Sequence, residues 1–143
     1  GVVYNAAGST MILEGGTYTA LDKYAILNDA ATMTINGATI TGYIGGEVDY
    51  SVLFSNVTVE EGAKVRYSII MPGTTIKSGA TVEYSIIAEN AVIEEDAKVG
   101  LSPEDSENRD DWGVTVIGEK VTIGKGVTVK AKEMIDEDIK GVK

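Results

Sequence analysis

The sequence repeats a 17-residue unit three times without a break. Residues 49–99 read DYSVLFSNVTVEEGAKV, RYSIIMPGTTIKSGATV and EYSIIAENAVIEEDAKV. A fixed period of this kind indicates units that stack on one another and share a continuous core. When the units are aligned, branched apolar residues form three columns, which are Leu53/Ile70/Ile87, Val59/Ile76/Ile93 and Val65/Val82/Val99. The columns divide each unit into steps of six, six and five residues, so we expect triangular coils with three inward points.

The residues between these columns predict corners. Asn56/Gly73/Asn90 and Gly62/Gly79/Asp96 are residue types that tolerate a positive φ angle, and Ala63/Ala80/Ala97 are small enough to point inward at a bend. No helical stripe with a period of 3.6 residues is sustained in the repeat, and its Val, Ile, Thr and Gly content favours short strands. We therefore predict an all-β fold, a parallel β-helix with coils of about 17 residues and a triangular cross-section. The six-residue sequence pattern resembles that of the left-handed hexapeptide family. The left-handed winding of the coils is inferred from that resemblance alone, since crossovers between parallel strands are otherwise right-handed.

Outward positions of the repeat carry three kinds of ladder. Charges alternate in sign along Asp49/Arg66/Glu83 and along Glu60/Lys77/Glu94, which favours this stacking register over a slipped one. The columns Tyr50/Tyr67/Tyr84 and Ser51/Ser68/Ser85 predict ring stacking and hydrogen bonding along the helix.

The repeat suggests three segments. Residues 48–131 form the β-helix, from which residues 100–113, GLSPEDSENRDDWG, are extruded as a loop before hexads resume at Ile117 and Ile123. Residues 132–143 read as a C-terminal cap or tail. In residues 1–47 the 17-residue frame fails at Asn36 and Gly42, so we expect an irregular β cap or divergent or foreign coils there. Because the chain begins with Gly1, it reads as a fragment or a processed product.

Composition excludes several classes of partner. The formal net charge of -10 repels nucleic-acid phosphates and anionic lipids, so neither nucleic acid nor a membrane is expected as a partner. The sequence shows neither a membrane-spanning apolar run nor a secretory leader. The absence of cysteine suits a reducing compartment, and we expect a cytoplasmic protein.

The residues that enzymes of this fold use are missing. The resemblance to the left-handed hexapeptide family implies one of three functional groups. These are acyltransferases with a histidine base, carbonic-anhydrase-like enzymes with three zinc-binding histidines, and non-catalytic helices of sugar nucleotidyltransferases. This sequence contains no histidine. It also lacks a glycine-rich phosphate loop, and Glu60/Glu61 and Glu94/Glu95 occupy outward corners. We therefore predict no catalytic, cofactor-binding or metal-binding residue in this chain.

One stretch resembles a particular family more closely. The start EVDYSVLF, the coil YSIIMPGTTI, the coil IIAENAVI and the later WGVTVIGEKVTIGKGVTV look like the C-terminal β-helix domain of bacterial glucose-1-phosphate adenylyltransferase, also called ADP-glucose pyrophosphorylase. The resemblance covers residues 47 to about 131. It implies a non-catalytic domain that packs against an upstream catalytic domain, supports a homotetramer and helps regulate an enzyme of glycogen synthesis. In that family the parent enzyme transfers the adenylyl group of ATP, with Mg, to glucose 1-phosphate.

The resemblance also suggests an anionic metabolite as effector. Arg66 and Lys77 are the cations on the regular coils and are our candidates for binding it, although their place in the charge ladders favours structural pairing.

Two alternatives stay open. One is the β-helix of another sugar nucleotidyltransferase, such as a mannose-1-phosphate guanylyltransferase relative or a catalytically silent regulatory homologue. The other is a stand-alone structural or binding β-helix. An ice-binding version of the latter is suggested by the Thr-x-Thr triplets at residues 32–34 and 39–41.

Overall fold

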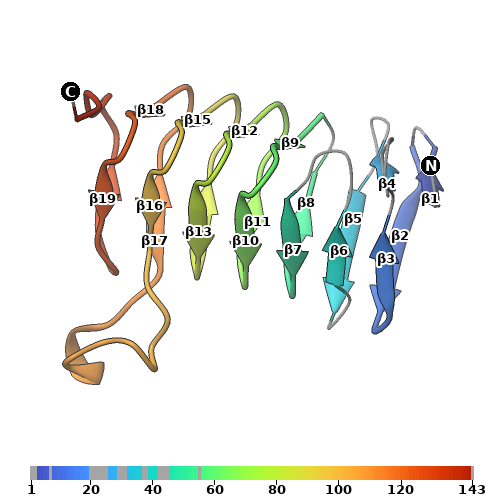
Figure 1. Ribbon diagram of the computed structural model, residues 1–143, viewed down its shortest axis with the longest axis horizontal. Coiled ribbons are helices and arrows are strands. Elements are labelled where there is room, and N and C mark those ends of the chain that lie inside the picture. The colour runs from blue at the N-terminus through green and yellow to red at the C-terminus, as the bar shows by residue number, and fades with distance from the viewer. Residues whose placement is uncertain are drawn as a thin grey trace.

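The computed structural model describes residues 3–6, 8–19, 26–28, 32–36, 39–41, 46–54 and 56–142. It confirms the predicted all-β fold, a solenoid of about five turns with parallel sheets, as in left-handed hexapeptide β-helices. Figure 1 shows the strands side by side along one axis, from β1 at the N-terminal end to β19 near the C-terminus. Within the described residues the helical content is a 3-10 turn, Arg109–Asp111, in the extruded loop.

Three sheets run along this axis, and we name each by the side chains on its outer side. The apolar sheet contains β2 (Thr10–Glu14), β5 (Thr32–Asn36), β8 (Val52–Leu53), β11 (Ile69–Ile70), β14 (Ser85–Ile87), β17 (Thr115–Ile117) and β20 (Met134–Ile135). The charged sheet contains β3 (Thr17–Thr19), β6 (Thr39–Thr41), β7 (Glu47–Asp49), β10 (Lys64–Arg66), β13 (Thr81–Glu83), β16 (Lys98–Val99) and β19 (Thr128–Val129). The threonine sheet contains β9 (Thr58–Val59), β12 (Thr75–Ile76), β15 (Val92–Ile93) and β18 (Thr122–Ile123). A short fourth sheet pairs β1 (Val3–Asn5) with β4 (Ile26–Asn28).

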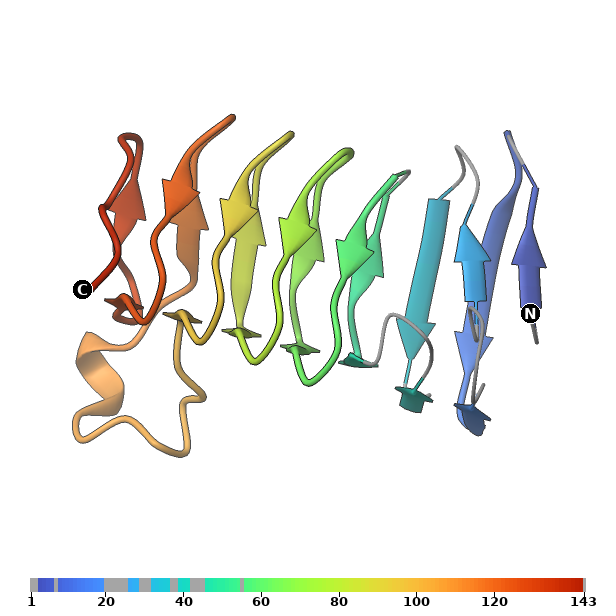
Figure 2. The same cartoon turned by 45° about the horizontal axis from the view of Figure 1, so that its top comes forward.

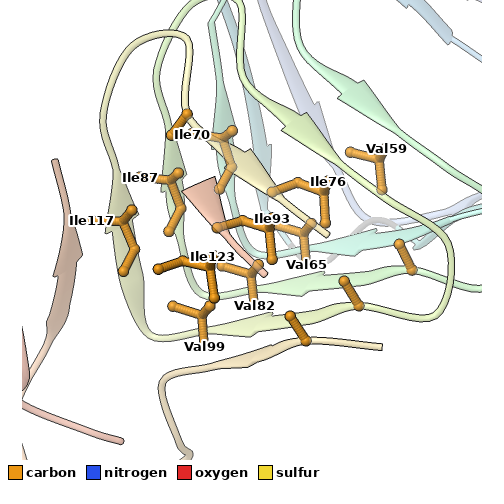
Figure 3. Packing of buried hydrophobic residues seen from close by; sticks show 14 of the residues in the cluster. Val59, Val65, Ile70, Ile76, Val82, Ile87, Ile93, Val99, Ile117 and Ile123 are labelled. Atoms are coloured by element: carbon orange, nitrogen blue, oxygen red, sulfur yellow. The ribbon is translucent and has the colours of Figure 1, made fainter. Parts of the chain in front are cut away.

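The predicted inward columns form the core. Strand pairing aligns Leu53 with Ile70 and Ile70 with Ile87, and the valine and isoleucine columns of the other two sheets align in the same way. Figure 3 shows these side chains stacked inside the coils. The residues that are 0% exposed include Val65, Ile70, Ile76, Val82, Ile87, Ile93, Ile117 and Ile123. Branched apolar residues recur here because each one packs on its counterpart one coil away.

The predicted corners are confirmed by the backbone. All six residues of the two turn columns have a positive φ, from 55° at Asn90 to 73° at Gly62 and Gly73. Gly73 has a further constraint, because a Cβ there would clash with the side chain of Asn90 in the next coil.

The serine column was expected among the outward positions but is buried, and it forms the predicted hydrogen-bonded ladder. The Ser68 hydroxyl donates to the carbonyl of Arg66 at 2.8 Å and accepts from the backbone N–H of Ser85 at 3.1 Å. Ser51 and Ser85 repeat the same donation to a carbonyl two residues earlier. The Ser51 and Ser68 hydroxyls therefore each accept from a buried backbone N–H of the next coil, which would otherwise lack this partner.

Replacing Ser68 with alanine is expected to lower the free energy of unfolding by about 2 kcal/mol, since it removes the acceptor of the buried Ser85 N–H and one of the two hydrogen bonds to the Arg66 carbonyl. Chemical denaturation measures the change. Ser106→Ala, which removes an exposed hydrogen bond in the extruded loop, is the control and should change stability by less than about 0.5 kcal/mol. Equal effects of the two variants would contradict the ladder's role.

The winding direction reverses between β6 and β7. Before this point the chain visits the short sheet, the apolar sheet and the charged sheet in turn, whereas afterwards it visits the charged, apolar and threonine sheets. Accordingly, β5 pairs with β8 and β6 pairs with β7 in antiparallel fashion, while the strands still advance steadily along the axis. Figure 2 shows the opposed arrows on either side of this junction. The first coils therefore wind with the opposite hand to the hexapeptide coils.

The first coils are also longer than the 17-residue units. Thr10 lies opposite Thr32, and Thr17 lies opposite Thr39. This explains in physical terms why the 17-residue frame fails at Asn36, the last residue of β5. Gly42 lies outside the described residues. The interpretation of residues 1–47 as a cap or as divergent or foreign coils stays a prediction.

The coils resume after the extruded loop. Ile87 pairs with Ile117 and Val99 with Val129, so the loop inserts into one coil without shifting the stack. Near the C-terminus, β20 pairs with β17, and Ile139 forms a bridge with Ile123. Residues 132–142 thus cover the last hexapeptide coil.

Candidate functional site

Arg66 lies on the charged sheet within a group of acids. Strand pairing places it opposite Asp49 and Glu83, as the predicted ladder requires. Its Nη2 donates to Glu47 Oε1 at 2.6 Å, whereas Nη1 lies 4.0 Å from Glu83 Oε1. The hydrogen bond to Glu47 raises the pKa of the Arg66 guanidinium, so this group stays charged. The short bond thus goes to Glu47, whose longer side chain reaches the guanidinium diagonally from the same strand as Asp49.

Lys77 occupies a corner next to the threonine sheet. Its Nζ lies 3.7 Å from Glu94 Oε1 and 3.7 Å from Glu95 Oε1. Glu60, the other predicted neighbour in this ladder, instead accepts hydrogen bonds from the backbone N–H and the hydroxyl of Ser78. The carboxylates at these corners therefore have structural partners.

The structure does not bring the two candidate cations together. Arg66 is on β10 of the charged sheet, and Lys77 follows β12 of the threonine sheet. Their side chains are 36% and 30% exposed, and each is paired with carboxylates of its own. In this arrangement Arg66 and Lys77 therefore do not form one binding site for a single anion.

We expect Lys77→Met to raise the pKa of Glu95. That pKa lies below its ordinary value mainly because of a hydrogen bond from the residue's own backbone and secondarily because of the Lys77 charge, so the variant should restore part of the difference. Because the folded-state pKa is depressed, the associated stability is present above the unfolded-state pKa and is lost as pH falls through the folded-state value. An NMR titration of the Glu95 carboxyl measures the shift. Lys98→Met on β16 is the control and should leave the titration unchanged.

Three tyrosines form a stacked column at the third corner of the coils. The rings of Tyr50 and Tyr67 lie 5.0 Å apart at an interplanar angle of 2°, and those of Tyr67 and Tyr84 lie 4.7 Å apart at 16°. The predicted stacking is confirmed. Sequence reasoning missed that all three residues have a positive φ, between 45° and 49°, although their regular position at a bend was a usable signal.

The extruded loop is anchored at the end of this column. The Trp112 ring packs edge-on against Tyr84 with centroids 5.4 Å apart, and its indole Nε1 donates to the carbonyl of Leu101 at 2.6 Å. The turn Arg109–Asp111 is capped by Asn108, whose side chain accepts from the backbone N–H of Asp110. In Figure 1 the loop projects away from the coils beside β16 and β17.

The acidic residues do not assemble into a metal site in the described part of the chain. The described segments also contain no helix long and apolar enough to span a lipid bilayer.

A comparison with protein-family models matches residues 24–118 to the family described as GlmU-like, C-terminal hexapeptide. The chain belongs to this family. The match includes the three 17-residue units and confirms the predicted hexapeptide repeat, a β-helix type found in the acyltransferase and nucleotidyltransferase families. A search among curated proteins gave no match.

Proposed function

We propose that this chain is the non-catalytic β-helix domain of a glucose-1-phosphate adenylyltransferase, an enzyme that makes ADP-glucose and diphosphate from ATP and glucose 1-phosphate. The observation that carries the proposal is the order of the repeat units and the extruded loop along the chain. Three unbroken 17-residue coils are followed by one extruded loop and a further coil, in the order that the resemblance implies. The histidine-free composition favours this role over that of an acyltransferase, which would need a base at its reacting centre.

In this proposal the domain acts through its shape. Stacked coils in which each unit contacts only its neighbours make a rod that holds other parts of an assembly in place. The partners would be an upstream catalytic domain, which would use ATP and Mg, and further copies of the same protein in a cytoplasmic enzyme.

The regulatory part of the proposal concerns anionic metabolites. Arg66 and Lys77 are accessible cations, and each would have to exchange a carboxylate partner for the ligand. The role of these two cations in effector binding stays a prediction, because the ion pairs of Arg66 with Glu47 and of Lys77 with Glu94 and Glu95 give both residues a structural role.

The nucleotide and the sugar can be tested on the full-length gene product. Diphosphate release should be fastest with ATP and glucose 1-phosphate. A preference for GTP with mannose 1-phosphate would instead assign the chain to the guanylyltransferase alternative. A gene product without any nucleotide-dependent release of diphosphate would favour the stand-alone β-helix.

A further inference from the structure

The phenol rings of the tyrosine column, Tyr50, Tyr67 and Tyr84, are stacked on one another along the outside of the coils. The ring centroids of Tyr50 and Tyr67 lie 5.0 Å apart and the ring planes differ by 2°, so the two rings are almost parallel. A centroid separation of this size is that of aromatic rings in contact. Each of these two phenols therefore has the phenol of the neighbouring coil as its immediate neighbour.

The backbone holds the two tyrosines in register. Both have a left-handed φ, 45° at Tyr50 and 49° at Tyr67, which is uncommon for a residue with a side chain. The N–H of Tyr67 donates to the carbonyl of Asp49 at 3.1 Å, and the N–H of Ser68 donates to the Ser51 hydroxyl at 3.1 Å. Strained residues persist where the surrounding structure fixes them, and they are concentrated at functional sites. The contact between the rings is therefore built into the corner of the coil.

Tyr50 and Tyr67 are also the members of the column that a reagent can reach. Their exposed fractions are 49% and 46%, whereas Tyr84 is partly buried and has the Trp112 ring packed against it with centroids 5.4 Å apart. Partial burial, together with the charges of the neighbouring tyrosines and of Asp49, raises the pKa of the Tyr67 phenol, so this group is protonated at neutral pH. The sequence contains no cysteine, so no thiol of the chain competes with the phenols for an oxidant.

We propose that Tyr50 and Tyr67 form a site of oxidative cross-linking, at which a haem peroxidase acting with hydrogen peroxide joins the two rings as dityrosine. Each phenol gives one electron to the oxidant and its hydroxyl proton to water, which leaves two neighbouring tyrosyl radicals. The two unpaired electrons form a carbon–carbon bond between ring positions next to the hydroxyl groups. Each of these carbons then loses its hydrogen as a proton while the phenol oxygen regains one, so both rings are aromatic again. Two phenols and one hydrogen peroxide thus give one dityrosine and two waters.

The geometry favours this reaction within one chain. Two tyrosyl radicals in solution couple only when they meet by diffusion, whereas here the partner ring is held in contact. The new bond closes a loop of 17 residues between neighbouring coils and restricts the unfolded chain as a disulfide would. An oxidising environment would thereby fasten two coils of the regular repeat to each other. This role does not depend on the function proposed above.

The test treats the 143-residue chain, in dilute solution, with a haem peroxidase and hydrogen peroxide. Dityrosine fluorescence should appear in a product that keeps the size of a single chain and has lost two hydrogen atoms for each link. Trypsin cleavage after Arg66 and Lys77 releases residues 67–77, and this peptide should be recovered joined to the peptide that contains Tyr50.

Phenylalanine variants identify the two rings, because phenylalanine keeps the stacked ring and removes only the hydroxyl group. Tyr67→Phe should lower the dityrosine yield at least about tenfold, since the two remaining phenols are then two coils apart. Tyr50→Phe should lower it at least about threefold, since only the pair with the covered Tyr84 remains. Tyr84→Phe is the matched control and should keep most of the yield.

Three results would overturn the proposal. The first is a treated chain without dityrosine under conditions that couple N-acetyltyrosine, which would show that the stacked pair does not react. The second is dityrosine found only in species larger than one chain. The third is an equal loss of yield in Tyr50→Phe and Tyr84→Phe, which would show that the exposed pair is not the site.

Discussion

We expect the replacement of Ile87 with alanine to lower the free energy of unfolding by about 3–4 kcal/mol. The side chain is fully buried and stacks between Ile70 and Ile117 in the apolar sheet. Truncation removes buried methyl groups and leaves a cavity that rigid coils above and below cannot fill. Chemical denaturation followed by circular dichroism measures the loss.

Ile86→Ala is the matched control for this prediction. Ile86 has the same side chain and lies on the same strand, but it points to the opposite side of the sheet and is only partly buried. It should cost less than half as much. A larger loss at Ile86 than at Ile87 would contradict the assignment of inward and outward faces.

Gly100→Ala is the second substitution with a large expected effect, a loss of about 3 kcal/mol. Gly100 follows β16 with a φ of 79°, and a Cβ there would clash with the backbone carbonyl of Glu83 in the preceding coil. The left-handed conformation and the forced backbone shift each contribute about half of the loss.

Gly62→Ala separates these two contributions. Gly62 has a similar φ of 73°, but a Cβ there would meet its nearest atom, the Gly79 backbone nitrogen, at an ordinary 3.7 Å. This variant should cost only about 1 kcal/mol, the conformational part alone. Thermal and chemical unfolding of both variants measure the difference, and similar losses would show that the close approach at Gly100 does not constrain the coil.

The regular coils could be predicted from the sequence because local residue type and global stacking agree there. The spacing of Leu53, Ile70 and Ile87 predicts their register, and glycine and asparagine at Gly73 and Asn90 predict the bends. In a solenoid each coil contacts only its neighbours, so a short repeat is sufficient to define the structure around it.

The first coils and the candidate site could be predicted less well. The reversal of winding between β6 and β7 depends on antiparallel pairing across the junction, which no 17-residue frame reveals. Arg66 could be placed opposite Asp49 and Glu83, but its short contact with Glu47 depends on side-chain reach. The outward position of Ile69 could not be predicted from its own strand, because in a strand of two apolar residues alternation does not show which residue is buried.

One pair of assays tests the central claim, that this chain is the non-catalytic part of a sugar nucleotidyltransferase. The full-length gene product and the 143-residue chain are each incubated with ATP, Mg and glucose 1-phosphate, and ADP-glucose is measured. We predict that the full-length product forms ADP-glucose and that the chain alone forms none. Nucleotide transfer by the chain alone, or a full-length product that transfers acyl groups instead, would contradict the account.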